Sequence, residues 1–148
     1  MTTSRYLTEP EKARALESWF GVLHDLPWQP GNAAGDRGDP DADMIPWCMR
    51  LNRLAGVVTL QSCSGHRRGD YLEPGHLWLW FSRTVDGRFA KQAHALAASP
   101  TIEDVSRLYK PDGREIVALT FRGNERDSLA VSMDRICTFI EQIATRAP

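Results

Sequence analysis

The chain has 148 residues, of which 42% are apolar and 25% charged, the usage of an ordinary globular domain rather than of a disordered segment. A chain of this length buries about two-thirds of the surface that its unfolded form exposes, so its stability requires no disulfide or metal. The formal net charge of -1 argues against a protein that binds nucleic acid by neutralising many phosphates. We therefore expect a single domain over residues 1–148 and no bulk binding of nucleic acid.

The first predicted element is an amphipathic helix over Thr8–Leu26. Thr8 and Glu11 have the spacing of a capping box, in which each side chain accepts a hydrogen bond from the backbone N–H of the other residue. Apolar residues then recur every three or four positions and mark one buried face: Leu16, Trp19, Phe20, Leu23 and Leu26.

A second helix is predicted from Met44 to about Leu54. Pro46 lies in its first turn, where a missing backbone N–H costs little stability.

Between these helices, residues 27–43 are rich in Pro, Gly and Asp and show no apolar periodicity. Structureless segments of this length inside a compact domain are usually functional or disordered. We expect this segment to be a mobile loop. Its aspartates lack the glutamate and the spacing of an EF-hand calcium loop: Asp36, Asp39, Asp41 and Asp43.

Strands are predicted next. Val57–Leu60 has the β-branched, apolar composition of a buried strand, and residues 67–75 read as a loop. His76–Ser82 alternates with a period of two and carries large apolar groups on both faces, which is typical of a central strand. Trp78 and Trp80 share one of these faces, and we expect them to be core residues rather than a stacking platform for a planar ligand.

The C-terminal third predicts a helix over Arg88–Ala98, then strands over 105–109 and 115–121 joined by the turn Lys110–Gly113. Asp127 is expected to cap a last helix, whose inner face is apolar: Leu129, Met133, Ile136, Phe139, Ile140 and Ile143. These elements predict a compact α/β (α+β) fold, with a mixed or antiparallel sheet and helices packed on it.

The cysteines are odd in number and widely spaced, which favours a reducing compartment over a disulfide framework: Cys48, Cys63 and Cys137. The N-terminus lacks the apolar stretch of a secretory signal, and no apolar run approaches the length of a membrane span. We therefore expect a cytoplasmic protein that does not enter a membrane.

The most distinctive segment is Ser62-Cys63-Ser64-Gly65-His66, which directly follows the first predicted strand. Such a position favours a site, because the scaffold is rigid there and the following loop is open. Gly65 permits a positive φ and a close approach to a ligand, and successive N–H groups of such a turn can form a nest for a phosphate or carboxylate. The alternative is a polar turn with an inert, buried cysteine.

Two kinds of chemistry fit this turn. Cys63 and His66 can act as thiolate and base, with Ser62 as a further catalytic candidate, because a neighbouring imidazolium lowers the pKa of a thiol. Cys63, His66 and His76 can instead bind a metal ion that assists hydrolysis. The sequence contains no complete ligand motif such as HExxH or CxxC, so we assign no metal ligands.

The residues assigned to ligand binding surround the catalytic candidates. Ser64 and Gly65 belong to the turn, Arg67 and Arg68 follow it and can attract an anionic group, and His76 begins the next strand. An antiparallel return of that strand would bring His76 back beside the turn. We therefore predict that Ser62, Cys63, Ser64 and His66 line a solvent-accessible cleft with His76 within reach.

The stretch Asn52–Gly65, NRLAGVVTLQSCSG, resembles the start of the wybutosine-synthesising methyltransferase family. Members have a short helix, a strand and then a Ser-Cys-Ser-Gly segment, and they modify a tricyclic guanosine derivative beside the anticodon of phenylalanine tRNA. The resemblance implies a binding or catalytic turn at Ser62–Gly65 and S-adenosylmethionine as cofactor. His66 stands where the family usually has arginine.

Three functions therefore remain open. The first is a small enzyme or ligand-binding domain that resembles the wybutosine-synthesising tRNA methyltransferases and takes a small-molecule or nucleotide-like ligand. The second is a non-catalytic module that binds an anion or a partner. The third is a metal-assisted hydrolase that uses Cys63, His66 and His76.

Overall fold

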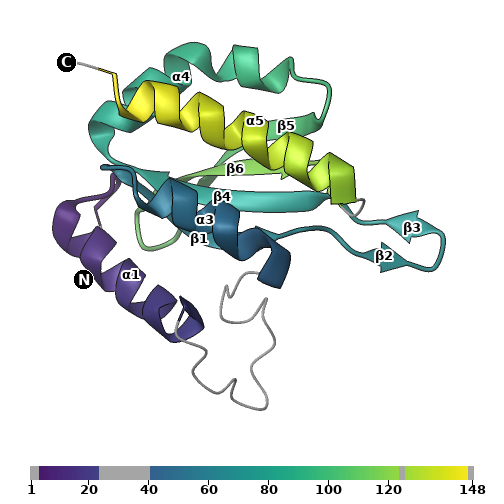
Figure 1. The fold of residues 1–148 in the computed structure, drawn as a ribbon. Coiled ribbons are helices and arrows are strands. Elements are labelled where there is room, and N and C mark those ends of the chain that lie inside the picture. Colours follow the sequence, from purple (N-terminus) through teal and green to yellow (C-terminus); the bar gives the residue numbers. More distant parts are fainter. Residues whose placement is uncertain (1–3, 24–40, 124–125, 147–148) are drawn as a thin grey trace.

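The computed structural model describes residues 4–23, 41–123 and 126–146. Its helical elements are α1 (Glu9–Leu23), the 3-10 helix η1 (Ala42–Met44), α3 (Ile45–Asn52), α4 (Arg83–Ala97) and α5 (Arg126–Ala144). Its strands are β1 (Val57–Cys63), β2 (Arg67–Arg68), β3 (Tyr71–Leu72), β4 (Gly75–Phe81), β5 (Ile102–Tyr109) and β6 (Glu115–Phe121). Figure 1 shows α3, α4 and α5 lying along one side of the sheet, while the β2–β3 hairpin projects from its end.

The main sheet has four strands in the order β1-β4-β6-β5, and each neighbouring pair is antiparallel. This confirms the predicted α+β fold and decides for the antiparallel sheet. β5 and β6 pair with each other across the predicted turn, where the Gly113 N–H donates to the Lys110 carbonyl at 2.9 Å. Gly113 has a φ of 99°, which glycine adopts without strain.

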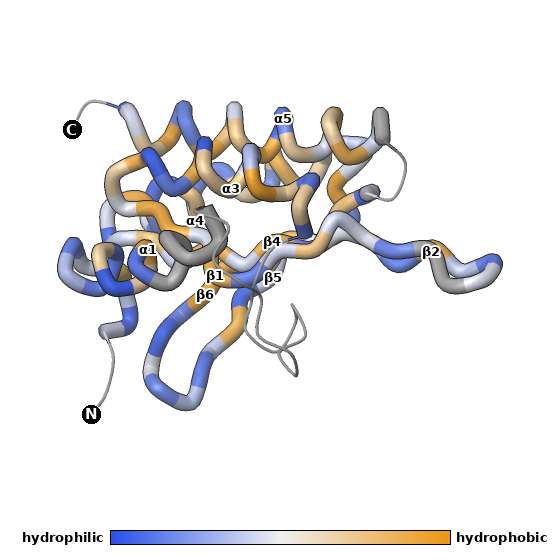
Figure 2. Tube along the Cα trace, turned by 60° about the horizontal axis from the view of Figure 1, so that its bottom comes forward, coloured by the Kyte–Doolittle hydropathy of each residue, from blue (hydrophilic) through white to orange (hydrophobic). Residues whose placement is uncertain are grey.

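The two faces of the sheet differ in what covers them. Alternate side chains of β4 and β6 pack under α3, α4 and α5, and we call this side the core face: Leu77, Leu79, Phe81, Val117, Leu119 and Phe121. The opposite side carries Cys63, His76, Trp78 and Thr120 in register, and we call it the Cys63 face. In Figure 2 the turn end of the β5–β6 hairpin extends to the side away from the helices.

A smaller apolar cluster joins the N-terminal segment to one end of the Cys63 face. Leu7, Val58 and Trp80 are buried together, with Leu16 of α1 packed against them. The Leu7 N–H also donates to the Phe81 carbonyl at 2.8 Å. The N-terminal segment and α1 are therefore fixed to the β1–β4 end of the sheet.

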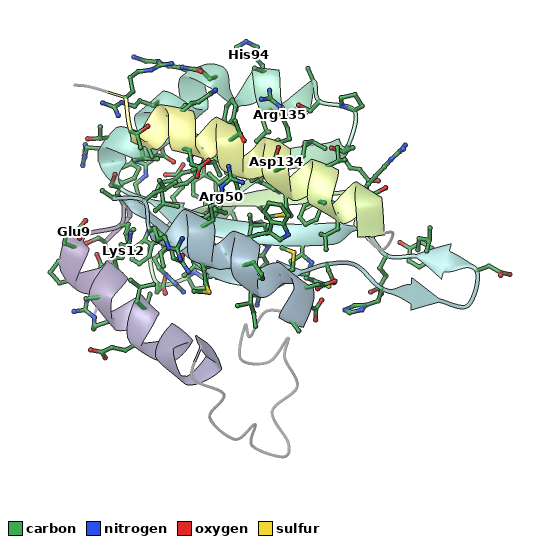
Figure 3. The ribbon with its side chains drawn as sticks, viewed as in Figure 1. Glu9, Lys12, Arg50, His94, Asp134 and Arg135 are labelled. Atoms are coloured by element: carbon green, nitrogen blue, oxygen red, sulfur yellow. The ribbon has the colours of Figure 1, made fainter. Side chains whose placement is uncertain are left out.

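Polar contacts hold the helices together at their surfaces. Arg50 of α3 donates to Glu141 of α5 at 2.9 Å and to Asp134 at 3.2 Å, and Figure 3 shows Arg50 and Asp134 pointing toward one another. The Lys12 ammonium of α1 donates to the Leu54 carbonyl just after α3. Thr8 and Glu11 do meet, through a bond of 2.6 Å between their side chains, at the predicted start of α1.

Some predicted boundaries were wrong. α4 begins at Arg83 rather than Arg88, because Ser82 caps it by accepting the Val85 N–H at 3.3 Å. Burial of Val85 outweighs its weak helix propensity. β5 begins at Ile102 rather than Val105, and the loop predicted over 67–75 contains the β2–β3 hairpin.

Other predictions fall partly on residues that the structure does not describe. The loop predicted over 27–43 lies there up to residue 40, whereas its last two residues, Ala42 and Asp43, belong to η1. The side chain of Asp127 and the side chains of the predicted apolar stripe of α1 beyond Leu16 also lie outside the described part of the chain. Within residues 4–23, 41–123 and 126–146, no helix combines the length and the apolar content needed to cross a membrane.

Candidate functional site

A β-bulge decides which face of the sheet Cys63 occupies. β1 continues beyond the predicted end to Cys63, and its register with β4 shifts between Thr59 and Gln61. In a regular strand Cys63 would lie on the same face as Val57, in the core. The bulge adds one residue and reverses the alternation that follows. Cys63 therefore lies on the face opposite the helices, and its neighbour Ser62 lies on the core face.

Ser62 consequently does not join the predicted catalytic cluster. It pairs in register with the core residue Leu77, is 8% exposed and accepts a hydrogen bond of 3.6 Å from the Cys48 thiol. Burial raises the pKa of Cys48 to about 11, so this thiol stays protonated at neutral pH. The predicted placement of Ser62 beside Cys63 in an accessible cleft is wrong, because consecutive residues of a strand point to opposite faces.

His76 does return beside the turn, as predicted. It is the direct cross-strand partner of Cys63, and Thr120 of β6 is its partner on the other side. Partners of an antiparallel pair have side chains on the same face, about 4.5–5.5 Å apart at Cβ. Burial lowers the pKa of His76, whereas the carboxylates of Asp41 and Glu73 oppose this shift. The imidazole is therefore largely neutral at pH 7.

Asp41 joins this group although its sequence position did not distinguish it. Its Oδ2 accepts the Ser64 N–H at 2.9 Å and the Ser64 hydroxyl at 3.0 Å. His66 Nε2 lies 3.3 Å from the same oxygen. Burial alone would raise the pKa of Asp41, but the bonds from Ser64 and the charge of His66 outweigh it and lower the pKa. Asp41 is therefore an ionised carboxylate fixed inside the turn.

Two backbone N–H groups of the turn, those of Ser64 and Gly65, already have acceptors. The Ser64 N–H donates to Asp41, and the Gly65 N–H donates to the Cys63 sulfur at 3.4 Å. Gly65 has the positive φ that was expected, 91°. The predicted anion nest therefore holds the protein's own carboxylate, whose charge disfavours a second anion and favours a cation.

The Cys63 thiol does not behave as the thiolate hypothesis requires. Burial raises its pKa, and the Asp41 carboxylate raises it further, whereas the bond from the Gly65 N–H acts in the opposite direction. His66, the predicted base, instead faces Asp41. Without a cation beside it, Cys63 is a protonated thiol at neutral pH and not an activated nucleophile.

Within the described part of the chain, the group of side chains with the arrangement of a metal site is Asp41, Cys63 and His66. One potential ligand atom from each lies within 4.8 Å of the others. Asp41 thus takes the place in this group that the sequence had given to His76. Asp41 is half-buried and His66 is 50% exposed at its side chain, so solvent reaches the group from one side.

The backbone around the turn is closely packed. A Cβ atom on Gly123 would lie 1.8 Å from the Ser64 carbonyl oxygen, and one on Gly75 would lie 2.4 Å from the Phe121 ring and 3.0 Å from the Cys63 carbonyl oxygen. Both positions therefore require glycine, and the carbonyl side of the turn rests on the segment after β6.

The predicted cleft has a different lining from the one expected. Ser62 and Ser64 are both buried, whereas Cys63 is half-buried and His66 exposed. A separate hollow of about 420 Å³ lies at the base of the β2–β3 hairpin, and no residue of the turn lines it: Tyr71, Leu72, Pro74, Glu103, Arg122, Gly123 and Ser128. Arg67 and Arg68 form β2, and their side chains are not among those described.

The two tryptophans of β4 have different surroundings. Trp80 is 3% exposed and donates to the Arg5 carbonyl at 3.0 Å, so it is a core residue as predicted. Trp78 is half-buried, and the Lys110 ammonium lies 4.8 Å from its ring centre. A cation at this distance interacts favourably with the ring. Trp78 therefore presents a partly accessible aromatic surface next to His76.

Comparisons with known proteins leave the family open. No protein-family model matches the chain, and no curated protein matches it. A solved structure, the PH1069 protein from Pyrococcus horikoshii, aligns with 93% of this chain and 94% of its own, at 15% identity and a TM-score of 0.46. This likeness is too weak to transfer an activity or a substrate.

Proposed function

We propose that the chain is a small enzyme whose active site lies on the Cys63 face. It transfers a methyl group from S-adenosylmethionine to a nucleotide-like acceptor, as do the wybutosine-synthesising methyltransferases that it resembles. The observation that carries the proposal is the partly accessible Trp78 ring with a cation already over it, next to His76 and Cys63. S-adenosylmethionine is a sulfonium cation with a planar base, and an aromatic ring can bind either group.

The spacing along β4 suits this reaction. His76 and Trp78 share a face two positions apart, about 6.6–6.8 Å along the strand. A group stacked on Trp78 would therefore place its neighbouring atoms beside His76 and Cys63. Stacking of a base on an aromatic side chain contributes about 1–3 kcal/mol. Such a ligand would displace the Lys110 ammonium, which is then available to pair with a phosphate.

In the proposed reaction, a nitrogen or oxygen lone pair of the acceptor attacks the methyl carbon. The carbon–sulfur bond breaks, its electron pair stays on sulfur, and the sulfonium becomes a neutral thioether. The acceptor loses a proton, which the neutral imidazole of His76 would accept. The net charge of -1 suits a nucleoside or short fragment better than tight binding of a whole tRNA. The free cysteines fit the cytoplasmic setting expected above.

Calorimetric titration of the full chain tests the proposal directly. We expect S-adenosylmethionine to bind more tightly than S-adenosylhomocysteine, because the ring favours the cation. Trp78→Leu should reduce the affinity about tenfold or more, which corresponds to about 1.4 kcal/mol. Tyr71→Leu, an exposed aromatic residue of the β2–β3 hairpin, is the matched control and should change nothing. Failure of both ligands to bind the wild-type chain would refute the proposal.

A rate measurement separates catalysis from binding. With the tricyclic guanosine precursor as acceptor, His76→Asn should lower the methylation rate about 100-fold or more and leave the affinity for S-adenosylmethionine intact. An unchanged rate would remove His76 from the reaction.

A further inference from the structure

We infer that Asp41, Cys63 and His66 form a binding site for Zn²⁺ with one coordination position left open. This goes beyond the proposed function, because methyl transfer from a sulfonium needs no metal. The inference rests on the placement of three different ligand types around one point on the Cys63 face: Asp41 directly before η1, Cys63 at the end of β1, and His66 in the turn that follows β1.

The chemistry and spacing of these atoms match zinc. Carboxylate oxygen, cysteine sulfur and imidazole nitrogen are its usual protein ligands. Two N or O ligands bound at about 2.0–2.1 Å in a tetrahedron lie about 3.3–3.5 Å apart. The distance from Asp41 Oδ2 to His66 Nε2 is 3.3 Å, so this pair needs little movement to share an ion. A coordinating thiol is deprotonated by the ion itself, so Cys63 needs no separate base.

The groups around the ligands already hold them in place. Ser64 gives two hydrogen bonds to the Asp41 carboxylate, and the Gly65 N–H donates to the Cys63 sulfur. Hydrogen bonds to the ligands are typical of metal sites, where they orient the ligand and tune its basicity. Gly123 packs against the Ser64 carbonyl and restrains the same turn from behind.

The charge of the site also favours a divalent cation. Asp41 occupies the turn as an anion, and a metal-bound Cys63 thiolate adds a second negative charge, so that Zn²⁺ brings the sum to zero. Such a neutral site does not repel a sulfonium bound at Trp78. Three protein ligands with one open position is the arrangement of catalytic rather than structural zinc sites, and the fourth ligand would be water or a donor atom of the substrate.

The test uses the full chain, freed of its tag and of metal, titrated with ZnCl₂ and with CoCl₂. We expect one equivalent of each ion to bind, and cobalt to give the thiolate charge-transfer band and the d–d bands of a tetrahedral site. Asp41→Asn, Cys63→Ser and His66→Gln should each weaken zinc binding about 100-fold or more, and Cys63→Ser should abolish the charge-transfer band. Ser64→Ala should weaken zinc binding about 10–100-fold, because it removes the hydroxyl bond to the Asp41 carboxylate and leaves only the bond from the Ser64 backbone N–H.

Each ligand variant has a matched control in the same chain. Asp43→Asn, Cys137→Ala and His94→Gln change the same residue types outside the group and should leave the affinity and the spectrum unchanged. Absence of stoichiometric zinc binding, or a charge-transfer band that survives Cys63→Ser, would overturn the inference. If a ligand variant fails to fold, the rise in melting temperature on adding zinc decides instead: it should be present in the wild type and smaller in Ser64→Ala, and its absence from the wild type would overturn the inference. These measurements contain no S-adenosylmethionine, so their outcome is independent of the proposed function.

Discussion

The core face and the Cys63 face of the sheet are built from the same strands but differ in how deeply their side chains are buried. On β4, Leu77 and Leu79 are completely buried under the helices, whereas His76 and Trp78, which alternate with them, are only half-buried. Because side chains alternate along a strand, core residues and candidate site residues are separated residue by residue rather than segment by segment. The neighbours Ser62 and Cys63 show this most clearly, since one packs in the core and the other belongs to the candidate site.

We expect the largest difference in unfolding free energy between two neighbouring positions of β6, one on each face of the sheet. Phe121→Ala removes a fully buried ring of the core face and should cost about 3–5 kcal/mol of unfolding free energy. Thr120→Ala, on the Cys63 face, should cost less than about 1 kcal/mol. Urea denaturation of both variants measures the difference. Equal costs would mean that the two faces contribute alike to stability.

The next prediction concerns the packing behind the turn. Gly123→Ala places a methyl group against the Ser64 carbonyl and should cost about 1–3 kcal/mol, together with weaker zinc binding. Gly87→Ala is the control, because nothing lies within 4 Å of its added Cβ in α4, and it should stabilise the chain by about 0.5–1 kcal/mol. Melting curves and a zinc titration of the two variants check both signs. A neutral Gly123→Ala would show that the turn is not restrained from this side.

The core face has a charged exception at the start of β6. Glu115 is buried and accepts hydrogen bonds from Arg5 and Arg107, which hold its pKa below the ordinary value of 4.5. The contribution of these hydrogen bonds to the free energy of unfolding is fully present above pH 4.5. It is lost as the pH falls through the lowered pKa that Glu115 has in the folded state.

Glu115→Gln should therefore cost about 1–2 kcal/mol at neutral pH, since the Arg5 side chain is 60% exposed and its attraction is screened by solvent. It should also flatten the decline in stability below pH 4.5. Denaturation between pH 3 and pH 7, with exposed Glu103→Gln as control, measures both effects. A wild-type slope retained in Glu115→Gln would assign the acid sensitivity to other groups.

The smallest effect is expected on the outer surface of the helix layer. Arg50→Met removes the contacts with Glu141 and Asp134 and should cost about 0.5–1 kcal/mol, because these groups are partly solvated. The cost should shrink further at high salt. Denaturation at low and high ionic strength checks this. A loss as large as that of Phe121→Ala would mean that the α3–α5 contact depends on charge rather than on apolar packing.

The sequence predicts most of the fold, because apolar periodicity and turn residues act locally. β6 has the predicted bounds, the Lys110–Gly113 turn joins the predicted strands, and the alternation of β4 correctly separates its two faces. The start of α4 was missed, because Val85 and Gly87 are weak helix formers whose preference is overruled by the Ser82 cap and by burial.

The candidate site is less accessible to sequence reasoning, for two physical reasons. The bulge between Thr59 and Gln61 leaves no sequence signal, yet it alone exchanges the faces of Ser62 and Cys63. Asp41 is one of several aspartates in a segment without periodicity, and only tertiary packing brings it against Ser64. The return of His76 was predictable because a short connection between strands makes an antiparallel pair.

Zinc-edge X-ray absorption of the full chain with one equivalent of Zn²⁺ tests the central claim most directly, namely that the Cys63 face gathers Asp41, Cys63 and His66 into a cation site. We expect one sulfur ligand at about 2.3 Å and N or O ligands at about 2.0–2.2 Å, including the scattering pattern of one imidazole. Cys63→Ser should remove the sulfur shell, and Cys137→Ala should leave it unchanged. A zinc ion with no sulfur ligand, or a sulfur shell that persists in Cys63→Ser, would contradict it.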